Sequence, residues 1–292
     1  MKEISYTPEM ISLLIPTRDR PDNVRRAINS VKNTASRPNL VEILFYVDLD
    51  DHTFPIDVLE KNIRLVRGPR MWLSVLQNIL YANASGEIIM YTGDDVVYET
   101  QGWDEKVRDM INSERDKLVL VYGNDSATHG ENIAIHGFLH RNWVEATGTW
   151  VAPGRGVPYD LWHTEVARKL GRLRYLNDVK FSHIHYRQGQ GLAEFDETYK
   201  YVSAATTSWV PIKTYKKVER ERRIDRVLLT EIMDPKPKVE KNYMLGEFLA
   251  ANKNRFGMQS VDSRRLRTLN NWEVIPLLAK NIMKVLIGKR RR

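Results

Sequence analysis

The stretch ISLLIPTRDRP, residues 11–21, decides the fold class. Its first half, Ile11 to Ile15, is a short aliphatic run, which is typical of a strand buried on both faces of a parallel sheet. Pro21 and Asp22 favour the first turn of a helix. The apolar positions that follow repeat at helical spacing: Val24, Ala27, Ile28 and Val31. A strand that leads directly into an amphipathic helix is the repeating unit of an α/β fold.

The same alternation continues along the chain. Short aliphatic runs predict further strands at 43–47, 63–66, 88–91 and 118–122, and a strand-like run at 180–186. Helical spacing predicts helices over about 71–83, after Gly102 and over about 161–170. Residues 123–160 lose this periodicity, so we expect loops and short strands there that carry specificity. The sequence therefore predicts an α/β fold, a Rossmann-like and mostly parallel sheet with helices on both faces.

Charge divides the chain into two parts. Residues 1–210 hold 24 Lys and Arg against 28 Asp and Glu, or −4, whereas residues 211–292 hold 21 against 9, or +12. We therefore expect one domain over 1–210 and a basic, mainly helical C-terminal extension over 211–292, with a linker at 235–237. A basic extension suits an anionic surface such as nucleic acid or phospholipid. The alternative is a pair of basic helices that packs on the body or aids solubility.

Composition excludes several classes of protein. The chain has no Cys, which removes disulfides, thiolate metal sites and cysteine nucleophiles. Residues 1–10 lack the layout of a secretory signal, and no window offers the ~20 apolar residues that span a bilayer. We expect a cytoplasmic protein without a transmembrane segment, and peripheral association with a membrane or with nucleic acid stays open.

Polar clusters follow four of the predicted strands: Thr17-Arg18-Asp19, Asp48 to Asp51, Arg67-Gly68 and Gly93-Asp94-Asp95. The carboxyl ends of parallel strands share one edge of the sheet, where such folds bind ligands. No glycine-rich turn or phosphate loop follows the first strand, which argues against NAD and P-loop sites. Adjacent carboxylates instead offer hard oxygen ligands for Mg²⁺ or Mn²⁺, which bridges phosphates.

Two histidines add to this set. His183 and His185 are two residues apart in a predicted strand, so their side chains lie on one face. One imidazole would complete a metal shell or contact a phosphate, and the alternative is a structural role for both.

Taken together, these motifs resemble the family 2 glycosyltransferases of GT-A fold. The resemblance rests on 11–21, Val47-Asp48, the segment from Gly68 through Asn78 to SGEIIMYTGDD at 85–95, and Gly148 followed by Tyr159-Asp160. It covers residues 10–200 and looks like the stand-alone enzymes of bacteria and phages. It implies transfer of a sugar from a nucleoside diphosphate donor.

The resemblance also implies roles for individual residues. The nucleotide would contact Pro16, Thr17, Arg18, Asp48, Arg67 and Asp94, and the metal would contact Asp94, Asp95 and His185. Thr92 stands where the family usually has the first Asp of its DxD motif, which leaves the identity of the metal open. The general base would be Asp160, which takes the proton of the acceptor hydroxyl; its alternative is a helix N-cap.

The predicted acceptor region holds polar and aromatic side chains suited to a sugar ring. We expect sugar or acceptor contacts from Trp103, Asp125, His136 and Arg141. For Trp103 the alternative is packing in the core.

The sequence thus predicts a metal-dependent inverting hexosyltransferase that uses Mn²⁺ or Mg²⁺ and a nucleotide-sugar donor, expected to be a UDP-sugar. The acceptor, a polysaccharide, a protein or DNA, stays open. The basic extension makes a phage-type DNA glycosyltransferase that acts on hydroxymethyl-pyrimidine bases the leading alternative. A nucleotidyltransferase and a non-catalytic nucleic-acid-binding protein are further alternatives, although a binding protein leaves the converging aspartates unexplained.

Overall fold

A computed structural model describes residues 6–126, 130–151, 158–184, 196, 215–216 and 218–234. The chain divides into two compact units, Met1–Met233 and Asp234–Arg292. The first unit is described below. The predicted linker at 235–237 and the rest of the basic extension beyond it lie outside the described residues.

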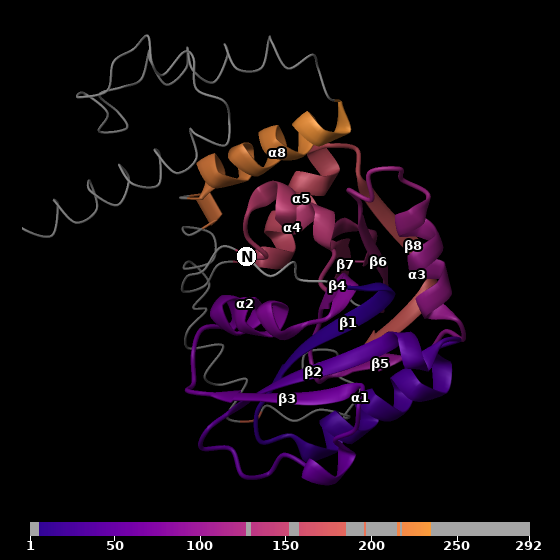
Figure 1. Ribbon diagram of the computed structural model, residues 1–292, viewed down its shortest axis with the longest axis vertical. Coiled ribbons are helices and arrows are strands. Elements are labelled where there is room, and N and C mark those ends of the chain that lie inside the picture. The colour runs from indigo at the N-terminus through magenta and orange to yellow at the C-terminus, as the bar shows by residue number, and fades with distance from the viewer. Residues whose placement is uncertain are drawn as a thin grey trace, which may run out of the picture. The chain divides into compact units, whose positions relative to one another are not determined.

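The first unit contains an eight-stranded sheet with the order β3-β2-β1-β4-β7-β6-β8-β5 (Figure 1). The strands are β1 (Thr7–Thr17), β2 (Val41–Asp48), β3 (Ile63–Gly68), β4 (Gly86–Tyr91), β5 (Val96–Tyr98), β6 (Leu120–Asn124), β7 (Gly137–His140) and β8 (Leu173–His183). Neighbours pair in parallel except that β7 runs antiparallel to both β4 and β6, and β5 runs antiparallel to β8. The prediction of a mostly parallel sheet is confirmed.

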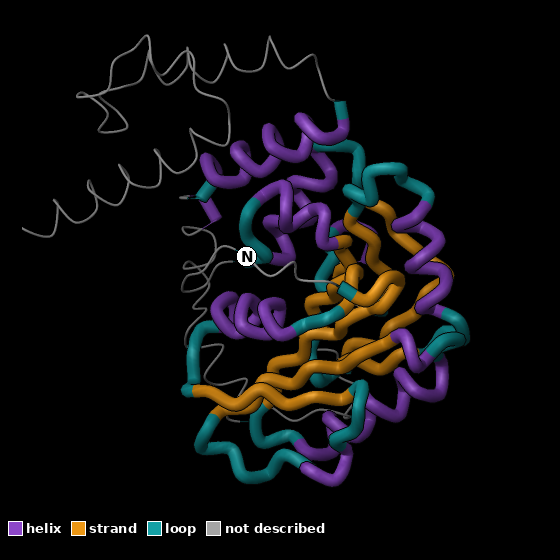
Figure 2. The backbone as a smooth tube through the Cα atoms, in the orientation of Figure 1, coloured by secondary structure: helices purple, strands orange, loops and turns teal. Residues whose placement is uncertain are grey.

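Helices cover both faces of this sheet (Figures 1 and 2). They are α1 (Pro21–Thr34), α2 (Leu73–Asn83), α3 (Trp103–Asn112), α4 (Arg141–Thr147), α5 (Tyr159–Lys169) and α8 (Glu219–Met233), with short 3₁₀ turns η1 (Pro38–Leu40), η2 (Ile56–Val58) and η3 (Gly130–Asn132). Helix α4 occupies part of the stretch in which the sequence predicted loops and short strands.

Two hydrophobic cores result, one on each face. Successive residues of β1 point to opposite faces, so Leu13 joins one core and Leu14 the other. The first core lies under α1 and α3, and the second lies under α2, α4 and α5. Because both faces are covered, every residue of β2 is buried. This double burial explains the uninterrupted apolar runs in the sequence.

Helix α8 belongs to the first unit. It packs against α4 and α5 and buries Leu229 in the second core. The indole Nε1 of Trp162 on α5 donates a hydrogen bond of 2.7 Å to Oδ2 of Asp225 on α8. The domain boundary expected at residue 210 stays a prediction, because residues 197–214 lie outside the described part of the chain.

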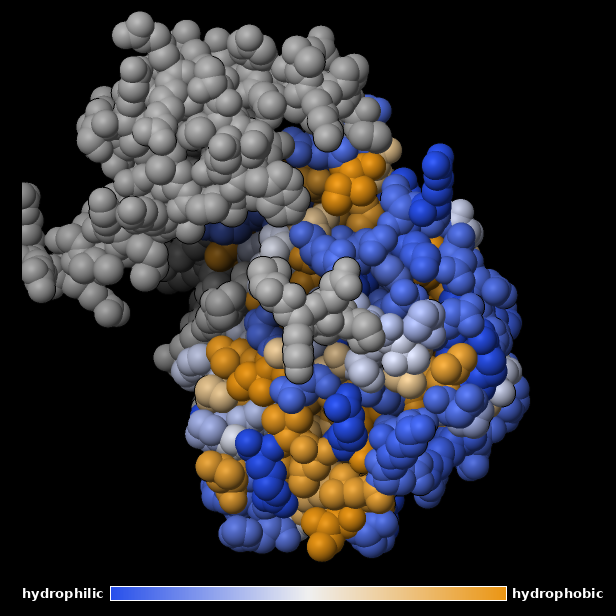
Figure 3. Space-filling model, in the orientation of Figure 1, coloured by the Kyte–Doolittle hydropathy of each residue, from blue (hydrophilic) through white to orange (hydrophobic). Residues whose placement is uncertain are grey.

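The surface of the first unit is uneven in character. On the face seen in Figure 3, hydrophobic residues gather in the lower part of the view, where Figure 1 places α2 and β3, and hydrophilic residues cover the side of α1 and α3. Of the helices in the described residues, none has the length and apolar content that a bilayer span requires.

Candidate active site

Polar residues from separate strands meet at the carboxyl edge of the sheet, as the topology predicted. At the end of β1, Thr17 Oγ1 donates a hydrogen bond of 2.6 Å to Oδ2 of Asp94, which follows β4. The next residue, Arg18, donates from Nη1 to Oδ2 of Asp48, the last residue of β2, at 2.8 Å. Two acids far apart in the chain are therefore held by adjacent residues of one strand end.

Arg18 also joins this edge to the loop after β2. Its two Nη atoms form hydrogen bonds of 2.6 and 2.9 Å with the carboxylate of Asp50. The hydrogen bond from Arg18 lowers the pKa of Asp50 to about 2. Arg18 therefore bridges the buried carboxylate of Asp48 and the exposed carboxylate of Asp50.

Arg67 lies at the end of β3 and braces the same loop. Its Nη1 donates to the backbone oxygen of Asp51 at 2.9 Å. Sequence reasoning did not single out Arg70, whose Nε lies 3.9 Å from Oδ2 of Asp48. The sequence offered one indication, a second arginine two residues after the end of the third strand.

Asp94 is almost fully enclosed, with 4% of its surface exposed. Its Oδ1 accepts a hydrogen bond of 3.1 Å from Arg20, and Arg20 in turn binds both carboxylate oxygens of Asp196 at 2.6 and 2.8 Å. Burial raises the pKa of Asp94 to about 6; Arg20 opposes this rise and the charge of Asp95 adds to it. Sequence reasoning missed Arg20 and Asp196 as site residues, because no local pattern pairs such distant positions.

Asp95 faces the imidazole of His183. His183 Nε2 lies 3.3 Å from Oδ2 of Asp95, and the backbone N–H of Ile184 donates to the backbone oxygen of Asp95 at 2.7 Å. Although burial favours the neutral imidazole, the hydrogen bond and charge of Asp95 raise the pKa of His183. His185, the expected metal ligand, lies outside the described residues, so its role stays a prediction.

Two of the expected sugar or acceptor contacts lie beside this pair. His136 is 7% exposed, and its ring meets that of His183 edge to face, with centroids 4.7 Å apart. Asp125 is buried, and its backbone oxygen accepts from the backbone N–H of His183 at 3.3 Å. Both residues are therefore at the same edge as Asp94 and Asp95.

Asp160 is placed at this edge by the first turn of α5. The preceding residue, Tyr159, packs edge to face on Tyr91, the last residue of β4, with ring centroids 5.4 Å apart. Burial and the nearby charges of Asp160 and Asp95 raise the pKa of Tyr159, so both carboxylates act on one phenol. Oδ1 of Asp160 accepts from the backbone N–H of Leu161 at 2.8 Å, which is a helix-terminus contact.

The structure places the other two expected contacts away from this edge. Trp103 is fully buried in the first core, where it packs on Tyr98 and Phe181. Arg141, 3% exposed, donates to the backbone oxygens of Gly86 at 2.6 Å and Ala84 at 2.7 Å, at the opposite end of β4. Both side chains serve the fold there, and neither enters the site proposed below.

The donor atoms at the edge suit a hard divalent cation. Asp94 and Asp95 offer carboxylate oxygens and His183 an imidazole nitrogen, a set that fits Mn²⁺ or Mg²⁺. Within the described ranges, no three acidic or histidine side chains are already gathered around one point. The arrangement matches sites in which one or two carboxylates share the cation with substrate phosphates.

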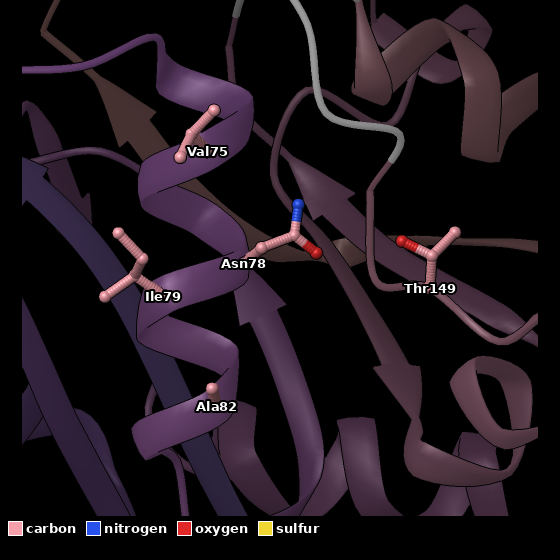
Figure 4. Close-up of a pocket in the computed structure, with 5 residues that line it drawn as sticks. All are labelled: Val75, Asn78, Ile79, Ala82 and Thr149. Atoms are coloured by element: carbon pink, nitrogen blue, oxygen red, sulfur yellow. The ribbon is translucent and has the colours of Figure 1, made fainter. Parts of the chain in front are cut away.

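A separate pocket of about 300 Å³ lies along α2 (Figure 4). It is lined by Val75, Asn78, Ile79, Ala82 and Thr149. Asn78 points across it, and its Nδ2 donates to the backbone oxygen of Val151 at 2.8 Å, which ties α2 to the segment after α4. The described lining carries no titratable group, so this pocket is not the candidate active site.

The fold is that of the GT-A glycosyltransferases, and in this chain aspartates line the carboxyl edge of the sheet. Residues 12–151 match the family described as Glycosyl transferase family 2. The chain therefore contains a domain of the glycosyltransferase family 2 type, over residues 12–151.

Solved structures support the fold. The structure of S. aureus TarS 1–349 in complex with UDP-GlcNAc is 12% identical, with a TM-score of 0.55 over 88% of this chain and 78% of that chain. The mannosyltransferase PcManGT from Pyrobaculum calidifontis, in complex with GDP-Man and Mn²⁺, is 13% identical, with a TM-score of 0.50 over 92% of this chain and 88% of that chain. No curated protein matches the sequence.

Proposed function

We propose that this glycosyltransferase is metal-dependent and inverting, and that it moves a hexose-type sugar from a UDP-sugar to a hydroxyl acceptor. The observation that carries the proposal is the meeting of Asp48, Asp94 and Asp160 at one edge of the sheet. Thr17 binds Asp94 and Arg18 binds Asp48, and Asp160 follows Tyr159, whose ring packs on Tyr91 at the end of β4.

The nucleotide end of the site is formed by β1 and β2. Pro16, Thr17 and Arg18 would line the base and ribose pocket, and Asp48 would accept a hydrogen bond from the base. Arg67 and Arg70 bring positive charge to the side where a diphosphate would lie. The two similar structures carry a uridine and a guanosine nucleotide, so the base of the donor is the first quantity to measure.

Asp94 and Asp95, with His183 or His185, would hold Mn²⁺ or Mg²⁺. The cation would neutralise the charge of the diphosphate leaving group. Asp125, beside His183, would contact the sugar or the acceptor. His136 would support this part of the site through the ring of His183.

Asp160 would supply the general base. It takes the proton of the acceptor hydroxyl while that oxygen forms a bond to the anomeric carbon. The bond from this carbon to the diphosphate oxygen breaks on the opposite face, and its electron pair leaves with the nucleoside diphosphate. One bond forms and one breaks at the carbon, so its configuration inverts.

The decisive experiment measures release of nucleoside diphosphate from a panel of UDP- and GDP-sugars with Mn²⁺. We expect the wild type to consume one donor and Asp94→Asn to lose at least ~100-fold in turnover, because a preorganised charged group is removed from the site. The matched control is Asp57→Asn, since Asp57 pairs only with Arg25 on the described surface. Equal turnover by Asp94→Asn and the control would contradict the proposal.

The acceptor class rests on charge. The +12 over residues 211–292 favours an anionic acceptor or surface, and hydroxymethyl-pyrimidine DNA is the second candidate function that this charge supports. A transfer assay with the identified donor and DNA containing hydroxymethylated bases tests it directly.

A further inference from the structure

A row of buried polar side chains leads from the end of β4 to the carboxylate of Asp95. Thr92 Oγ1 lies 3.3 Å from Nδ1 of His136. The rings of His136 and His183 meet edge to face, with centroids 4.7 Å apart and planes at 85°. His183 Nε2 lies 3.3 Å from Oδ2 of Asp95. Three separate contacts thus connect a hydroxyl to an acid of the candidate metal site.

Burial of His136, the middle residue of this row, costs free energy. His136 is 7% exposed, and its Nε2 has no hydrogen-bond partner within the described structure. A buried polar atom without a partner costs about 1–3 kcal/mol, whereas a phenyl ring of similar size would fill the same space without that cost. Packing alone therefore does not account for an imidazole here.

The contacts that His136 does make are directional. Register pairs Tyr91 with Gly137 across β4 and β7, so Thr92 and His136 are the next residues out from the paired strands. The hydrogen bond to Thr92 fixes the rotation of the His136 ring, and the edge-to-face contact then restricts the ring of His183.

We propose that His136 is a positioning residue: held by Thr92, it braces the His183 imidazole against Asp95 and so fixes the direction of the Asp95 carboxylate. Partners behind a ligating side chain set its orientation in this way, and their loss typically costs about 10- to 100-fold in metal affinity or activity. The consequence for catalysis rests on the proposed function, but the bracing itself does not.

Two single variants interrupt the row at different points. His136→Phe keeps a ring beside His183 and removes the bond to Thr92. Thr92→Val removes the same bond from the other end, together with a side-chain hydrogen bond to Tyr98. If His136 acted only by filling space, His136→Phe would be harmless. The matched control is His140→Phe, the same substitution at the other end of β7, where His140 contacts Asn142 instead.

The first measurement is side-chain NMR of the metal-free protein, which contains 7 histidines. His183 signals are identified by their loss in His183→Gln. We expect them to shift in both His136→Phe and Thr92→Val, to stay in place in His140→Phe, and to return in Thr92→Ser, which keeps the hydroxyl. Unchanged His183 signals in both single variants would overturn the proposal.

The second measurement is donor turnover with Mn²⁺, together with Mn²⁺ binding. We expect kcat to fall about 10- to 100-fold with little change in the KM for the donor. The double variant should be no worse than the poorer single one, because both act through one contact. If the loss of kcat in the double variant equals the product of the two single losses, the two residues do not act through one contact. If the wild type turns over no sugar nucleotide, the proposed function fails, while the NMR result still decides the role of His136.

Discussion

A methyl group at Gly93 would lie 2.6 Å from Oδ1 of Asp95, closer than a real Cβ approaches an oxygen. Asp95 has little freedom to retreat, because its other carboxylate oxygen faces His183. We therefore expect Gly93→Ala to turn the Asp95 carboxylate and to lower donor turnover and Mn²⁺ affinity about 10-fold or more. Isothermal titration with Mn²⁺ and a turnover assay check this.

The control for this substitution is Gly171→Ala. Gly171 has a φ of +68°, and a methyl group there meets nothing within 4 Å. It should cost about 1 kcal/mol of stability through backbone strain and leave Mn²⁺ affinity unchanged. An equal loss of Mn²⁺ affinity in both variants would contradict the steric explanation.

Asp94 links the site to the pH dependence of stability. Its pKa is about 6 in the folded chain against an ordinary value of 3.8, so between these values the folded state holds a proton that the unfolded state has released. Stability from this group is present at low pH and is lost as pH rises through 6. Asp94→Asn should therefore raise the free energy of unfolding by about 2–3 kcal/mol at pH 7.5 and by little at pH 4.

Urea denaturation in EDTA at the two pH values measures this difference. A gain at pH 4 as large as that at pH 7.5 would show that Asp94 is not the titrating group. The same variant is expected to lose turnover, so the acid would cost stability in exchange for function.

At the residue scale, the sequence predicted those site residues that topology alone brings together. Thr17 and Asp48 end their strands, and Asp94 follows one. The carboxyl ends of parallel strands share one edge of the sheet, whichever residues form the strands. Arg141 was assigned to the acceptor because it lies among polar and aromatic residues. Its side chain instead binds the backbone at the start of β4, and the sequence does not show at which end of that strand the side chain lies. The pair Arg20–Asp196 depends on a segment that returns from far along the chain.

Helix α8 holds α5, which carries Asp160, through a buried ion-pair cluster. Arg222 is 2% exposed, and its Nε lies 2.7 Å from Oε2 of Glu165 on α5. Removing one partner of a buried pair costs about 3–5 kcal/mol, since the other charge stays buried. Glu165 keeps Lys169 and Arg226 as partners, which favours the lower end of this range. We expect Arg222→Ala to lower the free energy of unfolding by about 3 kcal/mol in chemical denaturation.

The neighbouring arginine provides the control. The side chain of Arg223 is 71% exposed and pairs with Glu219 at 3.1 Å on the surface. Arg223→Ala should change the free energy of unfolding by less than about 0.5 kcal/mol. A similar loss from both substitutions would mean that the interface between α5 and α8 does not depend on the buried pair.

At the element scale, the strands predicted up to residue 122 and the long helices are confirmed, whereas the run predicted at 180–186 overlaps only the end of β8, which begins at Leu173. The short elements β5, β7 and α4 were not located individually. Strands β5 and β7 have three and four residues, too few for a period to be recognised. Helix α4, seven residues long, follows β7 without a loop, with His140 as its cap. The start of α4 was not recognised because no glycine or proline separates the strand from the helix.

At the scale of the whole chain, charge is the feature that distinguishes the two units. Residues 1–233 hold 31 Lys and Arg against 32 Asp and Glu, or −1, and residues 234–292 hold 14 against 5, or +9. We expect binding to duplex DNA to weaken steeply with salt, because each neutralised phosphate releases counterions. Exchanging Lys289, Arg290, Arg291 and Arg292 for Gln should flatten the slope of log K against log salt by roughly 3.

The matched control exchanges four exposed basic residues of the first unit for Gln: Arg25, Lys32, Lys106 and Arg223. The total charge changes equally in both variants, so only the position of the charge differs. Filter binding or fluorescence anisotropy from 50 to 300 mM salt, about the range in which such slopes are measured, separates them. Equal slopes would locate the contact outside the last four residues.

The reversed direction of β7 has a further consequence. Because β6 and β7 are antiparallel partners, with Tyr122 opposite Gly137, the chain leaves the sheet and re-enters it on the same rim. Asp125 and His136, the described residues next to the two strand ends, therefore lie on the reactive side of the sheet. Closing a longer loop costs only about 0.6 kcal/mol for each doubling of its length. Such a connection can be lengthened or rewritten to suit a new acceptor while the strands that anchor it keep their pairing.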